Sequence, residues 1–213
     1  MTYAARTRQP PRTIPDAEIA KLLKVSGQHR DAFRDHVIIS VALGLGLRKM
    51  EIAALNVGDV AIVDGKWPKC RRLIQLRVYA RKGRKGEKVD PKAQRCHVPD
   101  GCFYKLEKYL RGEFKARGFR PGASDPLFVG RGGARLSGRR IHELFHYWQR
   151  RAGFEHLYSF HELRHTAITN AYRLTKNIRI AQRVARHSLV QTTTIYEHAS
   201  DQEVADAIRK LAS

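Results

Sequence analysis

The hydrophobic periodicity of the chain changes twice, and these changes limit the folds that it can adopt. Apolar side chains first recur at helical spacing, as Ile19 and Leu22 do. Between Val57 and Pro99 the pattern becomes the alternation typical of strands, most clearly in residues 73–79, and then it returns to helical spacing. We therefore expect an α+β protein that is mainly α-helical, with a small three-stranded antiparallel sheet at one edge.

The expected elements follow from these patterns and from turn residues. Helices are predicted to begin at Pro15, near Leu47 and after Asp100, and to cover 31–43, 141–152, 160–175, 178–186, 194–199 and 202–211. Strands are predicted over 59–63, 73–80 and 95–98. The glycines of 130–133 predict a turn, and the sequence contains no internal repeat.

The length of the chain favours one folded domain after a short arm. With 213 residues, 42% of them hydrophobic, the chain can build one core, and two full domains would be a tight fit. Residues 1–12 carry Arg6, Arg8 and Arg12 but no acid, so they predict an extended basic N-terminal arm. A tail without a role is the alternative. The domain is expected over 13–213.

The charge of the chain indicates a polyanion as its partner. Lysine and arginine number 41 against 20 acids, which gives a formal net charge of +21. Such an excess in a chain with a core favours nucleic acid, although a ribosomal or histone-like protein would share it. Within Lys66–Arg95, twelve basic residues stand against two acids, so we expect a charged rim on the small sheet.

Neither a membrane segment nor a disulfide framework is expected. The longest strongly apolar run, 37–47, is shorter than the ~20 residues of a membrane helix, and residues 1–6 lack a signal-peptide core. Cys70, Cys96 and Cys102 form an odd set without C-x-x-C spacing, which fits a reducing compartment. We therefore expect a cytoplasmic protein that does not associate with membranes.

Two H-E-x-x-H stretches, at 142–146 and 161–165, raise a zinc hydrolase as an alternative. Neither continues into the extended pattern that would supply a third ligand, and Arg164 would repel a metal held at His161. The glycine segments at 44–49 and 130–135 lack the last glycine of a dinucleotide-binding loop, and no P-loop occurs. We expect neither a metal nor a cofactor.

Four pieces spread along the chain carry the chemistry. They are Gly46-Leu47-Arg48-Lys49-Met50-Glu51, His161-Glu162-Leu163-Arg164-His165, His187 and, nine residues later, Tyr196. Their order and spacing resemble the tyrosine recombinase (phage integrase) family, with its G-L-R-x-x-E box, H-x-L-R-H box, second histidine and C-terminal tyrosine. The resemblance covers about 13–211, and its specificity lies in the joint occurrence of the pieces.

The resemblance implies a site-specific DNA recombinase or integrase that cuts and rejoins strands through a 3′-phosphotyrosyl link, without metal or ATP. Two arginines, Arg48 and Arg164, suit the extra negative charge of a phosphorane-like transition state. Tyr196 would be the nucleophile and His161 its base, because a phenol of pKa ~10 is protonated at neutral pH. His187 would donate a hydrogen bond to the phosphate. Lys82 would protonate the leaving 5′ oxygen, with Lys85 as the alternative.

Some of these residues also have purely structural interpretations, and Tyr196, one of eight tyrosines, could be a packing residue. Arg48 could only pair with Glu51 at i,i+3, although the resemblance makes Glu51 the residue that orients Arg48. Ser159 and Glu162 predict a capping box at the start of the helix that carries the H-x-L-R-H box. An apolar stripe on that helix would hold the Arg164 side chain toward one surface; it comprises Leu163, Ala167, Ile168, Ala171 and Leu174.

Two departures from the family pattern affect the site. In the family the second histidine is usually the last residue of Leu-Gly-His, whereas this chain has Ala185-Arg186-His187. A glycine there permits a tight turn, so Arg186 alters the turn that leads into His187. A basic insertion at 90–95 blurs the register of the hairpin that carries Lys82.

The resemblance leaves the assembly and the type of enzyme open. Typical members carry a separate DNA-clamping domain, so the chain is either a fragment or similar to short members such as the fimbrial invertases. The final helix, with Val204, Ala207, Ile208 and Leu211 in line, would pack in its own core or dock on a neighbour in a tetramer on double-stranded DNA. A nucleoid-associated recombinase is the first interpretation. A type IB topoisomerase-like enzyme and a non-cutting DNA-binding protein are the alternatives.

Overall fold

Helices dominate the structure, a computed structural model that describes residues 12–29, 32–64, 67–77, 93–116, 118, 120–130 and 132–186. In these residues the elements are α1 (Asp16–Gln28), α2 (Phe33–Leu45), α3 (Lys49–Ala54), α4 (Val57–Val60), β1 (Ala61–Ile62), β2 (Lys69–Cys70), β3 (Leu73–Arg77), β4 (Ala93–His97), α5 (Asp100–Ala116), α6 (Gly138–Arg151), α7 (Phe160–Thr175) and α8 (Ile178–Ala185). The predicted class, mainly helical with small antiparallel strands, is confirmed.

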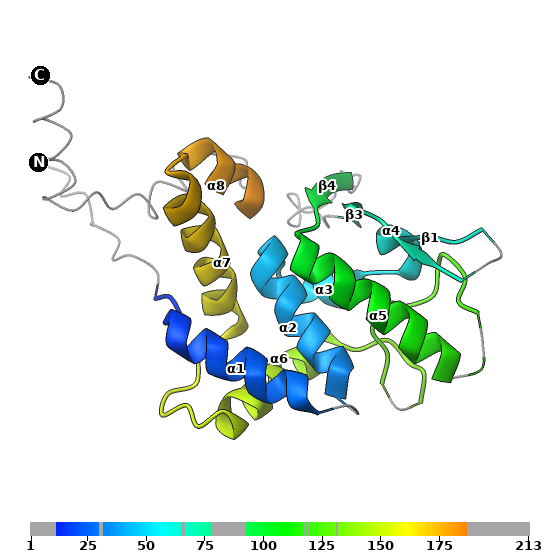
Figure 1. Ribbon diagram of the computed structural model, residues 1–213, viewed down its shortest axis with the longest axis horizontal. Helices are drawn as coiled ribbons and strands as arrows, with labels where there is room; N and C mark the ends of the chain where they lie inside the picture. Colours follow the sequence, from blue (N-terminus) through cyan, green and yellow to red (C-terminus); the bar gives the residue numbers. More distant parts are fainter. Residues whose placement is uncertain are drawn as a thin grey trace, which may run out of the picture.

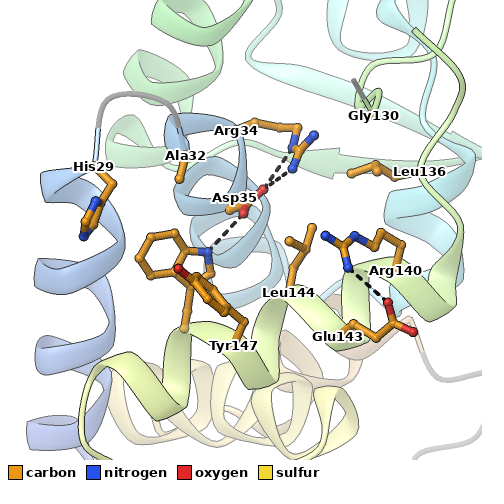
Figure 2. Close-up of a pocket in the computed structure, with 11 residues that line it drawn as sticks. His29, Ala32, Arg34, Asp35, Gly130, Leu136, Arg140, Glu143, Leu144 and Tyr147 are labelled. Atoms are coloured by element: carbon orange, nitrogen blue, oxygen red, sulfur yellow. Dashed lines mark hydrogen bonds and ion pairs between the residues drawn. The ribbon is translucent and has the colours of Figure 1, made fainter. Parts of the chain in front are cut away.

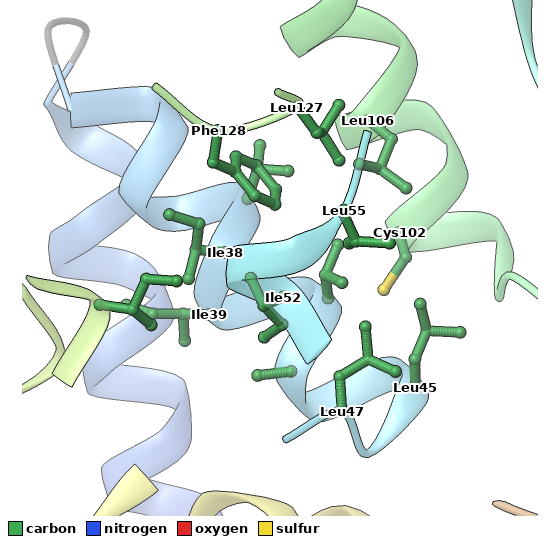
Figure 3. Packing of buried hydrophobic residues seen from close by; sticks show 14 of the residues in the cluster. Ile38, Ile39, Leu45, Leu47, Ile52, Leu55, Cys102, Leu106, Leu127 and Phe128 are labelled. Atoms are coloured by element: carbon green, nitrogen blue, oxygen red, sulfur yellow. The ribbon is translucent and has the colours of Figure 1, made fainter. Parts of the chain in front are cut away.

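Helix α2 is the central element and packs against α1, α5, α6 and α7 (Figure 1). Every residue from 35 to 42 is buried, so this central part of the helix has no solvent face, as expected of a core helix. Figure 3 shows Ile38 and Ile39 of α2 close to Ile52 of α3. Full burial of such a side chain contributes about 1.5–3 kcal/mol, so packing rather than helix propensity fixes short α3.

The two glycines at the end of α2 have different roles. Residue 43 was predicted to end this helix, but α2 continues to Leu45. Gly44 stays helical and lies directly against the Cys102 sulfur of α5, where a Cβ would have no room. Gly46 is the C-cap and adopts the left-handed conformation with φ 57°, which glycine accepts without strain. The chain therefore turns sharply just before Arg48.

The strands form two separate antiparallel pairs in the described residues, β1 with β2 and β3 with β4, instead of one three-stranded sheet. The predicted strand over 59–63 is wrong in its first half. Asn56 and Asp59 form a capping box that starts a helical turn, α4, with the Asn56 amide donating to Asp59 Oδ2 at 2.8 Å. The predicted strands at 73–80 and 95–98 correspond to β3 and β4.

Helices α6 and α7 begin at side-chain caps. Ser137 accepts a hydrogen bond from the Arg140 amide, so α6 starts three residues before its predicted start at 141. The predicted capping box of α7 is confirmed, since the Ser159 amide donates to Glu162 Oε2 at 2.6 Å and Ser159 Oγ accepts from the Glu162 amide. Among the described helices, none combines the length and the apolar character needed to cross a bilayer.

Helix α8 packs against α7 at one side of the molecule, where Figure 1 shows both in gold and orange. A small cluster of Ile168, Ala181 and Ala185 holds the two helices together. The predicted apolar stripe of α7 is confirmed through Ile168, but Leu174 is 87% exposed and lies outside it.

Candidate active site

Arg48 stands at the N-cap of α3, immediately after the Gly46 turn. Its backbone amide donates to Glu51 Oε2 at 2.7 Å, and its Nη1 donates to Glu51 Oε1 at 2.8 Å. The Arg48 side chain is 43% exposed, whereas that of Glu51 is only 8% exposed. The buried carboxylate therefore orients the guanidinium and leaves part of it open to solvent.

Arg164 lies on α7, one turn after the capping box, and is 2% exposed. Its Nη1 donates to the Gly46 carbonyl at the end of α2, and its Nη2 donates to the Ala185 carbonyl at the end of α8. The C-terminal carbonyls of helices carry partial negative charge, so both ends stabilise this buried cation. The same two bonds fix the position of the guanidinium between three helices.

His161 shares a cavity of about 300 Å³ with both arginines. The cavity, which we call the clamp pocket, is lined by Arg48, Lys49, Met50, His142, Ser159, Phe160, His161 and Arg164. Desolvation, together with the positive charges of Arg164 and Arg48, holds the pKa of His161 below its usual value of 6.5. The imidazole is therefore neutral at physiological pH and can accept a proton.

The predicted site residues divide into two groups. The structure brings Arg48, His161 and Arg164 together in the clamp pocket, although more than a hundred residues separate the first from the other two. Lys82, its alternative Lys85, His187 and Tyr196 lie outside the described residues.

The two H-E-x-x-H stretches are on helices as the zinc interpretation requires, but their carboxylates are engaged elsewhere. Glu162 belongs to the capping box, and Glu143 pairs with Arg139 and Arg140 at 3.0 and 3.2 Å. Within the part of the chain that the structure describes, no group of three or more His, Cys, Asp or Glu side chains could hold a metal ion. The donor set of these residues does not support a zinc centre.

Two residues near the pocket were not assigned a place in the site from sequence. His142 was noted only for the zinc pattern, but it lines the clamp pocket from α6. Arg186 was noted only as a departure from glycine, yet its side chain is 4% exposed and pairs with Glu51 at 2.6 Å. The departure from glycine was the one sequence signal at this position, and it did not reveal the interior partner of the guanidinium.

A second and larger cavity, of about 710 Å³, lies between α1, α2 and α6 and is separate from the clamp pocket. Its charges are paired: Asp35 accepts from Arg34 at 2.7 Å and from the Trp148 indole at 3.0 Å, and Arg140 pairs with Glu143 (Figure 2). These pairs neutralise the cavity locally. The clamp pocket differs from this cavity in that Arg48, Lys49 and Arg164 line it and none of its lining residues is an acid.

The chemistry of the clamp pocket suits a phosphate group. Two guanidiniums match the geometry of phosphate oxygens and keep their charge at any physiological pH. Arg48, Lys49 and Arg164 all line the pocket, and none of its lining residues is an acid. The neutral His161 adds a proton acceptor at the same place. The pocket can thus hold a phosphodiester and take a proton beside it.

The fold and the clamp pocket together define a mainly helical protein with a cavity that brings two arginines and a histidine together. The chain belongs to the phage integrase family, whose model matches residues 12–203. A tyrosine recombinase XerC of Vibrio vulnificus (strain YJ016) is 31% identical over 95% of the chain, and one of Corynebacterium efficiens is 30% identical over 96%. The chain spans 58% and 59% of the lengths of these two relatives.

Solved structures share the fold. A crystal structure of XerA recombinase covers 95% of the chain with a TM-score of 0.69 at 23% identity, and the chain spans 66% of it. The Tn1549 transposon integrase in complex with transposon right end DNA covers 97% of the chain with a TM-score of 0.72 at 19% identity, and the chain spans 68% of it. The mainly helical architecture is therefore that of recombinases.

Proposed function

We propose that residues 13–213 form the catalytic domain of a site-specific DNA recombinase, with 1–12 as its basic arm. One observation carries the proposal: in a chain of the phage integrase family, Arg48, His161 and Arg164 meet in one cavity. The names of the relatives, tyrosine recombinases and a transposon integrase, support the same activity. The reaction proceeds through a covalent protein–DNA intermediate and uses neither metal nor ATP.

In this proposal Arg48 and Arg164 bind the two non-bridging oxygens of the scissile phosphate. Negative charge on these oxygens grows as the phosphorus becomes pentacoordinate, so preorganised cations stabilise the transition state more than the ground state. Arg164 is prepared for this role by its two carbonyl partners and Arg48 by Glu51. Little reorganisation is then needed during the reaction.

Tyr196 supplies the nucleophile. Its phenolic oxygen attacks phosphorus and forms the 3′-phosphotyrosyl bond while the bond from phosphorus to the 5′ oxygen breaks. His161 takes the phenolic proton, and His187 donates a hydrogen bond to the phosphate. Lys82, or alternatively Lys85, gives a proton to the departing 5′ oxygen. Attack of a 5′ hydroxyl on the phosphotyrosyl bond reverses these steps and rejoins the strand.

The proposed partner is double-stranded DNA. We propose that the protein is cytoplasmic and associated with the nucleoid. Solved relatives include XerH recombinase bound to difH substrate, with a TM-score of 0.71 at 18% identity and 98% of this chain covered. The excess of 41 basic over 20 acidic residues suits a DNA backbone. We further propose that the C-terminal helix with Val204, Ala207, Ile208 and Leu211 docks on a neighbouring protomer to form a tetramer on two duplexes.

A covalent-trapping experiment tests the activity. The chain is incubated with nicked suicide-substrate DNA and analysed by denaturing electrophoresis beside the Tyr196→Phe variant, with Tyr147→Phe as a matched control on α6. We expect a covalent adduct with the wild type and with Tyr147→Phe but none with Tyr196→Phe. An adduct that survives in Tyr196→Phe would disprove the role of Tyr196.

The same preparation separates the two alternatives. Relaxation of supercoiled plasmid by a monomer, without paired sites, would indicate a type IB topoisomerase-like enzyme. Intact DNA binding with no adduct on any substrate would indicate a DNA-binding protein that does not cut.

A further inference from the structure

Arg186 adopts a backbone conformation that favours glycine. Its φ of 54° and ψ of 40° lie in the left-handed region, directly after the last residue of α8 and before His187. A side chain is strained in this region, and contacts of the arginine can offset that strain. The Arg186 side chain is 4% exposed and therefore makes those contacts inside the protein.

The contacts of Arg186 reach the loop that carries Arg48. Its Nη1 donates to the Leu45 carbonyl and its Nη2 to the Gly46 carbonyl, both at 3.0 Å, and Nη2 also pairs with Glu51 Oε2 at 2.6 Å. These are charge-assisted hydrogen bonds in a low-dielectric interior, and the guanidinium fork makes them together. One side chain thus joins the end of α8 to the end of α2 and the start of α3.

Arg186 shares an acceptor with each arginine of the clamp pocket. The Gly46 carbonyl accepts from Arg164 Nη1 as well as from Arg186 Nη2. The Glu51 carboxylate accepts from Arg48 Nη1 through one oxygen and from Arg186 Nη2 through the other. A change at Arg186 therefore alters a partner of Arg48 and a partner of Arg164 at once.

The shared carboxylate also affects the charge of the site. Burial alone would raise the pKa of Glu51, but Arg186 and Arg48 outweigh it and hold that pKa below its usual value. With Arg186 present, one negative charge serves two guanidiniums, so the group retains a net positive charge. Without Arg186, Glu51 would pair with Arg48 alone and neutralise it.

We propose that Arg186 is a positioning residue that replaces the usual glycine and couples the turn before His187 to Arg48 and Arg164. It fixes the Gly46 turn through two carbonyls and, by sharing Glu51, leaves the positive charge of Arg48 only partly compensated where Arg48 faces the phosphate. The inference rests on the proposed function for its consequence in strand cleavage, while its consequence for phosphate binding can be measured separately.

The first test measures single-turnover adduct formation at saturating DNA for Arg186→Gly and Arg186→Lys. Glycine keeps the left-handed turn without strain, and lysine keeps the charge without the fork. We expect the rate constant to fall by about tenfold or more in Arg186→Gly and to recover only partly in Arg186→Lys. DNA affinity should fall by no more than about fivefold, since the buried Arg186 side chain does not face solvent and only the contact of the clamp pocket with one phosphate is altered. Arg183→Ala, which removes an exposed charge from the same helix, should keep the wild-type rate constant.

A double-mutant cycle distinguishes positioning from a general structural role. If Arg186 acts through Arg48, Arg186→Gly should slow an Arg48→Ala enzyme far less than it slows the wild type. Equal slowing in both backgrounds, or slowing that only follows a loss of thermal stability, would overturn the proposal. An unchanged rate constant in Arg186→Gly would overturn it as well.

A second measurement does not depend on catalysis. The Arg48 Nε–Hε signal is followed by NMR during titration with inorganic phosphate, in wild type and in Arg186→Gly. We expect the dissociation constant for phosphate to rise by about fivefold when Arg186 is lost, and equal constants would refute the positioning role. If the wild type forms no adduct on any DNA, the proposed recombinase activity fails, and this titration alone decides the role of Arg186.

Discussion

At the scale of single residues, the ionisation of His161 decides when the proposed base is available. Its pKa is lowered by desolvation and by the charges of Arg164 and Arg48. A lowered pKa keeps the imidazole neutral through the physiological range, and protonation begins only in more acidic solution. His161 should therefore lose its ability to accept a proton only as the solution becomes acidic.

We predict that the rate constant of adduct formation falls on an acid limb centred below pH 6.5, because the pKa of His161 is lowered. Single-turnover rates at subsaturating DNA between pH 5 and 8 report groups of the free protein and would locate this limb. His161→Asn should slow adduct formation by about 10²–10⁴-fold and remove the limb. His156→Asn, at an exposed histidine that does not line the clamp pocket, serves as the control and should retain it. A limb centred above pH 6.5 would contradict the lowered pKa.

The residues of the clamp pocket differ in how far sequence could predict them. Arg48, His161 and Arg164 stand in short boxes whose letters are adjacent in the chain, so the boxes could be read directly. The contacts of Arg186 could not be predicted from sequence, because its partners Gly46 and Glu51 lie 140 and 135 positions away. Only the fold brings such residues together. The role of His142 in lining the pocket was missed for the same reason.

At the scale of elements, local signals determined which predictions held. Helix α7 was predicted with its observed bounds because Ser159 and Glu162 mark its start. The two-residue strands β1 and β2 were not predicted as such, since two residues carry no periodicity. The end of α2 was misplaced because Gly44 is helical for a reason of packing against Cys102, which sequence does not reveal.

Helix α8 begins at a side-chain N-cap, and we predict that this cap stabilises the helix. Asn177 Oδ1 accepts hydrogen bonds from the Arg179 and Ile180 amides at 2.9 and 3.3 Å. Asn177→Ala should cost roughly 1 kcal/mol of helix stability, because two amides of the first turn lose their acceptor. Hydrogen exchange of α8 amides should accelerate about fivefold while α2 amides stay protected.

Asn177→Asp is the matched control for the α8 prediction, since its carboxylate can also cap the helix. Its α8 amides should exchange at the wild-type rate. If Asn177→Ala left α8 exchange unchanged, the cap would contribute nothing, and packing on α7 alone would hold the helix that leads to Arg186. Uniform acceleration over α2 and α8 would instead indicate global destabilisation.

At the scale of the whole molecule, two sets of charges have different roles. The net positive charge of the chain attracts DNA, whereas the buried arginine of the clamp pocket acts in the reaction. The net charge of +21 is spread over the chain and acts through solvent, where salt screens it. Arg164, at 2% exposure, is largely protected from that screening. The two contributions should therefore respond differently to ionic strength.

We predict that raising salt from about 50 to 200 mM weakens duplex binding by on the order of 10³-fold, as expected if about six phosphates are neutralised. Fluorescence anisotropy with a labelled duplex measures this dependence, and single-stranded DNA of equal length should give a shallower slope per phosphate. At saturating duplex, the rate constant of adduct formation should change far less, because the clamp arginine Arg164 is buried. A nearly flat affinity would contradict an electrostatic DNA interface. A rate constant that fell in parallel with affinity would place the catalytic charges in solvent rather than in the protected pocket that the fold builds around Arg164.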